Sequence, residues 1–361
     1  MSSGRLQSFV HGGDIYSAES PLGHWLDFSA NINPLGLSES VKKAIMAGIE
    51  GLVHYPDPQG RELKQAISAS YRVPEKAVVL GNGAAELFYV YFHTVRPKKV
   101  LIPVPSFSEY ERSARGAGVE VKRLFLQEEK SFSLDLDGIC QEMADCNTVL
   151  LGNPNNPTGE LLKRDFVTEV VKEAKKRNID VLVDESFLDF RQDRLEYSVL
   201  NLVNEFDNLL VVSSLTKFYA IPGLRLGFGA ASQELVHQLD FNKDPWNVNL
   251  LAQKAGVAVL ADKAYQNESR NLLKDEIKWL YNRLLDIPGL TVYEPRVNFI
   301  LLNLTKCGIT SRELSQAMRD KGILIRDCSN YPGLDENYVR VAVRNREENV
   351  KLVKALNDCL E

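Results

Sequence analysis

The chain has 361 residues, of which 44% are hydrophobic and 25% charged, and its formal net charge is −5. This composition is typical of a globular protein of about two domains. The mild negative charge disfavours nucleic acid as the main partner, because a basic footprint is absent. No stretch reaches the roughly 18 consecutive apolar residues of a membrane span, so we expect no membrane partner.

Neither the N-terminus nor the cysteines indicate secretion. Residues 1–10 are polar, with one arginine and no apolar centre, so no secretory signal is visible. The five cysteines lack CxxC spacing and are interpreted as reduced thiols rather than as metal ligands or a disulfide framework. We therefore expect a cytoplasmic protein without a metal site.

The N-terminal segment, through about residue 49, is rich in turn-forming residues and is expected to lack strands of its own. A helix is predicted over residues 39–49 by the apolar side chains along one face. A proline-stiffened connection at 54–58 and a second helix over 61–71 follow it.

Predicted strands then alternate with predicted helices as far as residue 230. We expect strands at 77–80, 100–104, 119–126, 148–151, 179–183, 209–212 and 224–230. The most regular helix between them is amphipathic and covers residues 164–177. This alternation predicts an α/β fold with a mostly parallel sheet and helices on both faces.

Beyond residue 247 the pattern becomes that of a smaller α+β domain. Helices are predicted over 250–261, 265–285, 311–321 and 347–360, and strands over 290–304, 323–326 and 338–343. We expect the N-terminal segment to pack with this part. The predicted division is a large domain over residues 50–262 and a small domain that joins residues 1–49 to 263–361.

The stretch from Ser213 to Gly227 has the residue types of a Schiff-base site. A single lysine, Lys217, follows several hydroxyl residues, and Arg225 stands beyond a Pro-Gly turn. A lysine amine becomes nucleophilic when burial and neighbouring charge lower its pKa. Hydroxyls such as Ser214 and an arginine are the donors that a phosphate group needs. A lone lysine is usually exposed, so the interpretation depends on the other strand ends.

Further candidates follow predicted strands, at the edge where an open parallel sheet binds ligands. Gly83-Ala84-Ala85 opens a helix and offers backbone N–H groups to an anion. Asp184 ends an apolar strand, so its carboxylate needs a cationic partner, such as a protonated pyridine nitrogen, or caps a helix. Asn156 lies in a rigid turn and would donate from its amide, and Phe107 would cover a flat ring.

Together these residues resemble the fold-type I pyridoxal-phosphate enzymes, specifically the class I and II aminotransferase superfamily. The resemblance extends over about residues 26–360, and its most specific motifs are Asn-Pro-Asn-Asn-Pro-Thr-Gly at 153–159 and Lys217 with Arg225. It implies that pyridoxal 5′-phosphate is bound, that Lys217 is the catalytic residue and forms the Schiff base, and that the protein is a homodimer. One departure is Phe187, because many relatives carry there a tyrosine that donates to the phenolic oxygen.

The resemblance also assigns the cofactor contacts. Asp184 pairs with the pyridine nitrogen, Asn156 faces the phenolic oxygen and Phe107 stacks on the ring. The phosphate is held by Ala84, Ala85, Ser214 and Arg225, and Tyr55 reaches the phosphate of the other subunit's cofactor.

The choice among transamination, decarboxylation and racemisation depends on residues around the substrate. Arg326 and Arg340 lie on predicted strands, and a guanidinium fork binds carboxylate or phosphate. For Arg344, a surface ion pair is as good an interpretation. Matching arginines bind the substrate in histidinol-phosphate aminotransferases, so the resemblance implies a phosphorylated amino substrate.

Within the superfamily, the chain most resembles the threonine-phosphate decarboxylases of cobalamin biosynthesis. Four segments support this resemblance: His11-Gly12-Gly13-Asp14, residues 26–36 with Asn33, residues 214–227 around Lys217, and residues 330–335, Asn-Tyr-Pro-Gly-Leu-Asp. The resemblance predicts decarboxylation of L-threonine-O-3-phosphate to 1-amino-2-propanol O-phosphate. The substrate-binding residues would be His11, Asn33, Arg326 and Arg340, although a lone histidine is more often structural.

Three alternatives remain open. L-serine-O-phosphate lacks only one methyl group, which is worth about 1–3 kcal/mol of discrimination. Histidinol-phosphate aminotransferase activity is the second alternative. The third is a cofactor-binding regulator without catalysis, although no basic helix-turn-helix pattern precedes residue 26.

Overall fold

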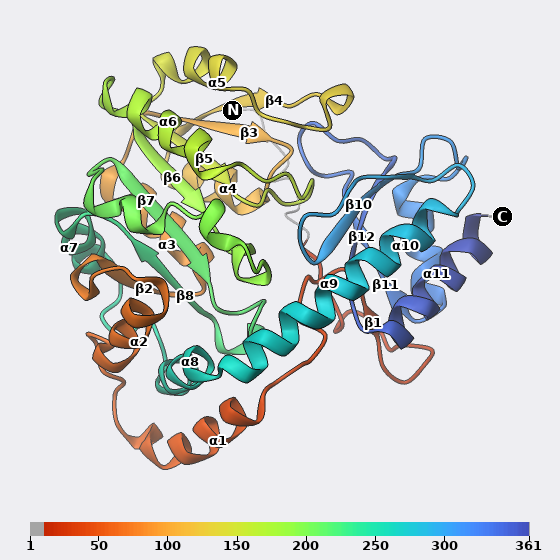
Figure 1. The fold of residues 1–361 in the computed structure, drawn as a ribbon, viewed down its shortest axis with the longest axis horizontal. Helices are drawn as coiled ribbons and strands as arrows, with labels where there is room; N and C mark the ends of the chain where they lie inside the picture. The colour runs from red at the N-terminus through yellow and green to blue at the C-terminus, as the bar shows by residue number, and fades with distance from the viewer. Residues whose placement is uncertain (1–10, 361) are drawn as a thin grey trace, which may run out of the picture.

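The computed structural model describes residues 11–360, and a seven-stranded sheet forms its larger part (Figure 1). The segment 1–10, in which we expect no secretory signal, lies outside the described residues. Adjacent strands across the sheet are β2 (Val78–Asn82), β8 (Leu226–Ala230), β7 (Leu209–Ser214), β6 (Asp180–Asp184), β5 (Thr148–Gly152), β3 (Lys99–Val104) and β4 (Glu120–Phe125). Strand β8 is antiparallel to β2 and β7, and the remaining pairs are parallel. This confirms the predicted mostly parallel sheet.

Two hydrophobic cores cover the two faces of this sheet. Successive side chains of a strand point to opposite faces. In β6, Val181 and Val183 accordingly belong to one core and Leu182 to the other. The first core also contains side chains of α2 (Arg61–Tyr71), α5 (Leu136–Glu142), α6 (Arg164–Lys175) and α8 (Leu250–Ala261). The second contains side chains of α3 (Ala84–Val95), α4 (Ser108–Gly116) and α7 (Gln233–Asn242).

The long helix α9 (Lys263–Leu285) connects the large sheet to a smaller α+β part (Figure 1). A four-stranded antiparallel sheet there has the order β12 (Arg326–Asp327), β13 (Tyr338–Ala342), β10 (Phe299–Asn303) and β9 (Thr291–Val292). Helices α10 (Ser311–Asp320) and α11 (Arg346–Leu360) accompany it. No helix in the described part of the chain is long and apolar enough to cross a membrane.

Three predictions about strands were wrong. The predicted strand over 290–304 is broken into β9 and β10, and the one over 323–326 is divided between β11 (Ile323–Leu324) and β12, which belong to different sheets. The N-terminal segment does contain a strand, β1 (Leu26–Asp27), which pairs with β11. A two-residue strand is too short to produce the alternating pattern by which strands are recognised.

The N-terminal segment contacts both parts of the fold. Its strand β1 pairs with β11 of the smaller part, in keeping with the proposed division into 1–49 with 263–361 and 50–262. Its helix α1 (Glu39–Gly48) instead lies against α8, where a Cβ on Gly48 would approach Cδ2 of Leu251 to 3.1 Å (Figure 1). The division remains our proposal.

Candidate active site

The carboxyl ends of the central strands surround one pocket. It encloses about 600 Å³ of empty space, its open mouth included. Eight of the predicted site residues line it: Ala84, Ala85, Phe107, Asn156, Asp184, Ser214, Lys217 and Arg225. These residues are brought together because β5, β6 and β7 run parallel and end at the same edge of the sheet.

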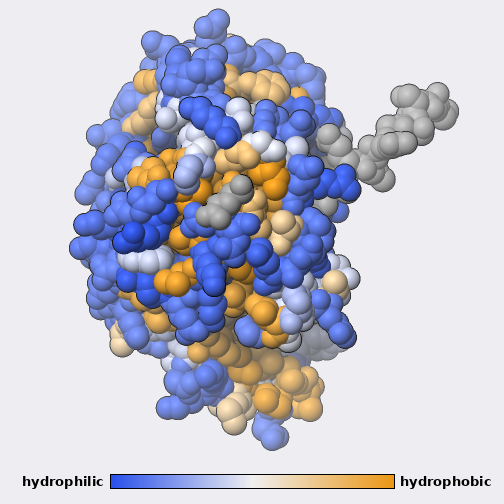
Figure 2. Space-filling view, turned by 90° about the vertical axis from the view of Figure 1, so that its right-hand side faces the viewer, coloured by the Kyte–Doolittle hydropathy of each residue, from blue (hydrophilic) through white to orange (hydrophobic). Residues whose placement is uncertain are grey.

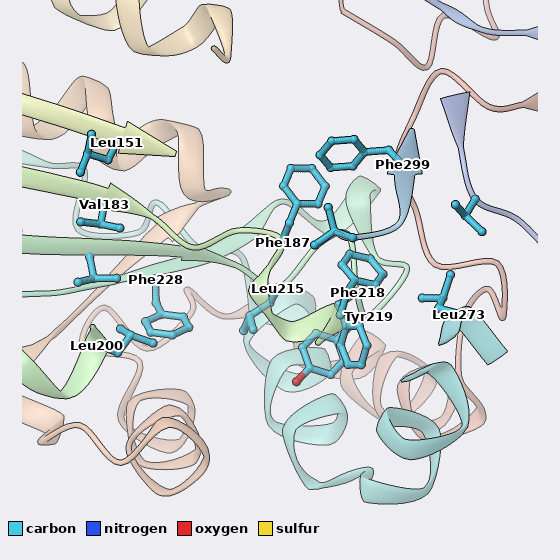
Figure 3. Packing of buried hydrophobic residues seen from close by; sticks show 14 of the residues in the cluster. Leu151, Val183, Phe187, Leu200, Leu215, Phe218, Tyr219, Phe228, Leu273 and Phe299 are labelled. Carbon is cyan, nitrogen blue, oxygen red and sulfur yellow. The ribbon is translucent and has the colours of Figure 1, made fainter. Parts of the chain in front are cut away.

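Lys217 follows β7 and is partly buried in this pocket. Burial lowers the pKa of its amine to about 8; Asp184 opposes the shift, whereas the positive charges of Arg225 and Arg340 reinforce it. The Nζ atom lies 4.9 Å from the centre of the Phe187 ring, which stacks edge-on against Phe299 (Figure 3). A substantial fraction of the amine is therefore neutral near physiological pH, as a nucleophile requires.

Asp184, the last residue of β6, is buried and forms no ion pair with any described residue. Its Oδ2 accepts a hydrogen bond from the hydroxyl of Tyr110 at 2.7 Å, and its Oδ1 accepts one from the backbone N–H of Ser186 at 2.9 Å. Burial and the nearby Asp184 raise the pKa of Tyr110 well above its usual range, so this hydroxyl stays protonated and donates. Asp184 is not the helix cap of the alternative interpretation, because the next helical turn, η5 (Leu188–Phe190), begins four residues later and has Phe187 at its N-cap position.

A second set of donors surrounds the turn between β2 and α3. Gly83 has φ +82°, and a Cβ placed on it would lie 2.3 Å from Nη2 of Arg225, so the guanidinium lies directly against the turn. The hydroxyls of Ser214 and Thr216 are 2.7 Å apart and both line the pocket. Arg225 was predicted to begin a strand, and this was wrong. It follows a 3-10 turn, has φ +58°, and β8 starts one residue later.

These two sets of groups fit pyridoxal 5′-phosphate. Asp184 is a buried carboxylate with the Lys217 amine as a nearby charge, but neither Asp184 nor Arg225 forms an ion pair with any described residue. A buried unpaired carboxylate is costly, and a protonated pyridine nitrogen would neutralise it. The cofactor's phosphate would likewise meet Arg225, the hydroxyls and the free N–H groups at the start of α3. Lys217 would supply the amine for the aldehyde.

Arg340 and Arg326 are opposite one another on adjacent antiparallel strands, β13 and β12. Both are buried, and neither forms an ion pair with a described residue. Arg340 donates through Nη1 to Oδ1 of Asn156 and through Nη2 to the carbonyl of Ser29 at 2.7 Å, while its buried Nε has no partner. Because Arg340 occupies the Asn156 oxygen, the amide nitrogen of Asn156 is left to donate into the pocket. Arg340 is thus an uncompensated cation next to the lysine pocket, and Arg326 is a second one beside it on β12.

Arg344 differs from these two. Its Nε and Nη2 donate to the carboxylate of Glu348 at 3.0 and 3.1 Å, and its Nη1 lies 3.4 Å from the carbonyl of Asp27. An ion pair, one of the two interpretations of this arginine, is what the structure contains, although the pair is partly buried rather than on the open surface.

His11 is exposed but lies near the pocket. Its Nε2 is 2.8 Å from Oε1 of Glu109, and its ring centre is 5.8 Å from that of Phe107. Although burial opposes the shift, hydrogen bonds from His11 and Tyr89 lower the pKa of Glu109 to about 2. Two residues after His11, the backbone N–H of Gly13 donates a hydrogen bond to Oγ of Ser29 at 2.7 Å.

Five predicted residues do not line this pocket: His11, Arg326 and Arg340, described above, and Asn33 and Tyr55. Asn33 was predicted to bind substrate, but its amide donates to the carbonyl of Phe218 and the hydroxyl of Ser269, both at 2.7 Å, and its oxygen accepts from Leu35. With its side chain saturated by internal bonds, Asn33 holds the backbone near Lys217, whose carbonyl accepts from the Asn33 N–H at 3.0 Å. Tyr55 is 80% exposed outside the pocket, so its proposed contact with another subunit's cofactor remains a prediction.

The aminotransferase class I and II family model matches residues 23–356. The chain belongs to this family. The threonine-phosphate decarboxylase of Salmonella typhimurium is 37% identical over 361 residues, which cover 98% of each chain. Among solved structures, the histidinol-phosphate aminotransferase of Clostridium acetobutylicum is 34% identical with a TM-score of 0.87, over 93% of this chain and 99% of that one. The L-threonine-O-3-phosphate decarboxylase of Porphyromonas gingivalis is 28% identical with a TM-score of 0.82, over the same shares.

Family likeness confirms the α/β fold of the fold-type I enzymes, but both activities occur among similar proteins. Within one fold, the activity must be argued from the site. Sequence reasoning did not assign Tyr110 to the site, although it stands three residues after Phe107, the residue that precedes α4, and both side chains line the pocket. Thr216, directly before Lys217, was grouped only with the other hydroxyls.

Proposed function

We propose that this chain is a pyridoxal-phosphate-dependent decarboxylase that converts L-threonine-O-3-phosphate to 1-amino-2-propanol O-phosphate in cobalamin biosynthesis. The observation that carries the proposal is the end-to-end identity of 37% with a threonine-phosphate decarboxylase. The site supports it, because an O-phosphorylated amino acid has two anionic groups. Two buried arginines without carboxylate partners, Arg340 and its strand neighbour Arg326, lie next to the pocket through the contact of Arg340 with Asn156.

The chain's own groups divide the work of holding the cofactor and the substrate. Asp184 would hold the pyridine nitrogen and Asn156 the phenolic oxygen, with Phe107 against the ring. The phosphate would be held by Ser214, Arg225 and the N–H groups of Ala84 and Ala85. The guanidinium forks of Arg326 and Arg340 bind the carboxylate and phosphate of the substrate.

When bound, pyridoxal phosphate supplies the electron sink for the pair released as the substrate carboxylate departs as carbon dioxide. Lys217 is the proton donor to the substrate Cα, since its Nζ has a pKa of about 8 and retains a proton in most molecules at neutral pH. The Phe187 ring beside Nζ offers no hydroxyl. The phenolic oxygen therefore has Asn156 as its principal donor, which distinguishes this site from relatives with tyrosine at that position.

We further propose that the enzyme is a cytoplasmic homodimer in which Tyr55 reaches the cofactor of the other subunit. Tyr55 stacks on Trp246 at 4.8 Å between ring centres, although both rings are largely exposed. Large apolar side chains are exposed on the neighbouring α1 and η1 (Ile49–Val53): Met46, Ile49, Leu52 and Val53. Figure 2 shows hydrophobic surface at the bottom of the molecule, where α1 lies in Figure 1. An apolar patch of this kind favours a protein interface.

The deciding assay incubates the purified holoenzyme separately with L-threonine-O-3-phosphate and L-serine-O-phosphate, and measures carbon dioxide and the amine product. We expect decarboxylation of both, with threonine phosphate preferred about 10–200-fold if the pocket contacts the extra methyl group. Lys217→Ala must abolish turnover. Formation of glutamate from histidinol phosphate and 2-oxoglutarate, without carbon dioxide release from either phosphoamino acid, would instead establish an aminotransferase.

A further inference from the structure

A second pocket lies behind the sheet edge and shares no lining residue with the active site. It encloses about 740 Å³ of empty space, its open mouth included. We call it the arginine pocket, and its lining residues are Tyr71, Arg72, Arg164, Arg194, Leu195, Ser198, Leu200 and Asn201. It lies between the end of α2, the start of α6 and the segment that follows β6.

Three of the lining side chains are positively charged, and none is negatively charged. Arg194 is neutralised by Asp189, whose Oδ1 accepts from its Nη1 at 3.0 Å, and its guanidinium stacks on Tyr71. Arg72 and Arg164 form no ion pair with any residue in the described range 11–360. The pocket therefore has an excess of about two positive charges.

Of the two unpaired arginines, Arg164 is held by hydrogen bonds, whereas Arg72 is exposed at the end of α2. Arg164 is half-buried, and its Nη1 donates to the carbonyl of Ser198 and to Oδ1 of Asn201, which hold the guanidinium in one orientation. Arg72 ends α2 in the left-handed conformation, with φ +58°. A guanidinium that is held by neutral acceptors keeps its full charge and its remaining N–H donors for a ligand.

The start of α6 adds to the positive potential. Arg164 is its first residue, and no side chain caps this end of the helix, so its first backbone N–H groups are without helical acceptors. The helix dipole places partial positive charge at the same end. The one acidic residue of the first turn, Asp165, is exposed and does not line the pocket.

We propose that the arginine pocket is a second anion-binding site, which takes the dianionic phosphate group of a small molecule. A phosphate monoester carries about −1.5 to −2 charges at neutral pH, which matches the excess positive charge of the pocket. Its oxygens accept from planar guanidinium forks in the geometry that arginine favours. The site is independent of the proposed decarboxylase reaction, because none of its lining residues belongs to the active site.

The test is calorimetric titration of the holoenzyme with inorganic phosphate at constant ionic strength. The Arg326→Gln variant provides the background, because the active site also contains anion-binding arginines. We expect this variant to retain a saturable phosphate site, and we expect Arg72→Gln or Arg164→Gln, added to it, to weaken that site about tenfold each. Arg61→Gln is the matched control, since Arg61 also belongs to α2 but is paired with Asp57 outside the pocket.

Because Arg72 is exposed, we expect Arg72→Gln to fold normally. Its phosphate affinity can therefore be measured even if Arg164→Gln proves unstable. Phosphate affinity that is unchanged by Arg72→Gln and by Arg164→Gln would overturn the proposal. A response to added chloride equal to the response to phosphate would overturn it as well, because it would show general charge screening rather than a built site.

Discussion

Replacing Arg326 by glutamine removes a buried cation that lies opposite Arg340 on the neighbouring strand and disturbs little else. Arg326 is 5% exposed, its Nη2 donates to Oδ1 of Asn330 at 2.8 Å, and its guanidinium lies 5.1 Å from the centre of the Tyr331 ring. No described carboxylate is paired with it. The variant should therefore fold with unchanged or slightly higher stability, because an uncompensated buried charge is lost.

The expected loss of activity follows from the hydrogen bonds that the guanidinium fork makes to a substrate anion. A hydrogen bond to a charged group contributes about 1.5–3 kcal/mol, and a fork makes two. The lower figure for each bond gives a loss of about 3 kcal/mol, which corresponds to a roughly 150-fold fall in kcat/KM. Most of the fall should appear in KM if the anion is held equally in the bound substrate and in the transition state.

The assay is carbon dioxide release from L-threonine-O-3-phosphate across a range of substrate concentrations, with the absorbance of bound cofactor as the check on loading. Arg344→Gln is the matched control, since it removes the same charge from an arginine that is paired with Glu348 outside the pocket. A kcat/KM for Arg326→Gln within about threefold of the wild type would refute the assigned role. Equal losses in both variants would refute it too, because the effect would then be one of overall charge.

Three further variants or titrations test the cofactor site and a buried carboxylate, Glu185, which accepts hydrogen bonds from the hydroxyl of Ser198 and the N–H of Val199. Gly83→Ala should weaken cofactor binding at least tenfold, because the added Cβ would lie 2.3 Å from Nη2 of Arg225 at φ +82°, whereas Gly223→Ala, with open space around its Cβ, should bind normally in the same fluorescence titration. In the cofactor-free protein, amine-selective labelling of Lys217 should rise with a midpoint near pH 8; a midpoint near the ordinary 10.5 would show that burial does not lower its pKa. Since that folded pKa lies below the unfolded value, the contribution of Lys217 to stability should improve as the pH rises from about 8 to 10.5. Burial raises the pKa of Glu185 from 4.5 to about 7. The free energy of unfolding should therefore fall as the pH rises from 4.5 to 7, by about 3 kcal/mol at the upper end. Urea unfolding of Glu185→Gln should not show this fall.

Much of the active site could be predicted from the sequence because its residues directly follow recognisable strands. Asp184 and Lys217 come after apolar runs that could only be buried strands, and parallel strands end at one edge of a sheet. Helices with a clear apolar face were predicted with similar success, and α2 and α8 begin and end where the pattern placed them. The positions of these strands and helices follow from the local spacing of apolar residues, because that spacing is set within each element and does not depend on distant segments.

The sequence by itself thus determined the class of fold, the strand ends that carry chemistry and the residues that suit a pyridoxal phosphate. Only the tertiary structure decided which polar side chains remain available to a ligand. Asn33 was predicted to bind substrate but is saturated by Phe218 and Ser269, which lie about 200 residues away in the chain. Conversely, Arg326 and Arg340 become neighbours because β12 and β13 pair in one register, and neither has a carboxylate partner among the described residues. Hydrogen-bond saturation and charge compensation depend on contacts between distant segments, which residue patterns along the chain do not contain.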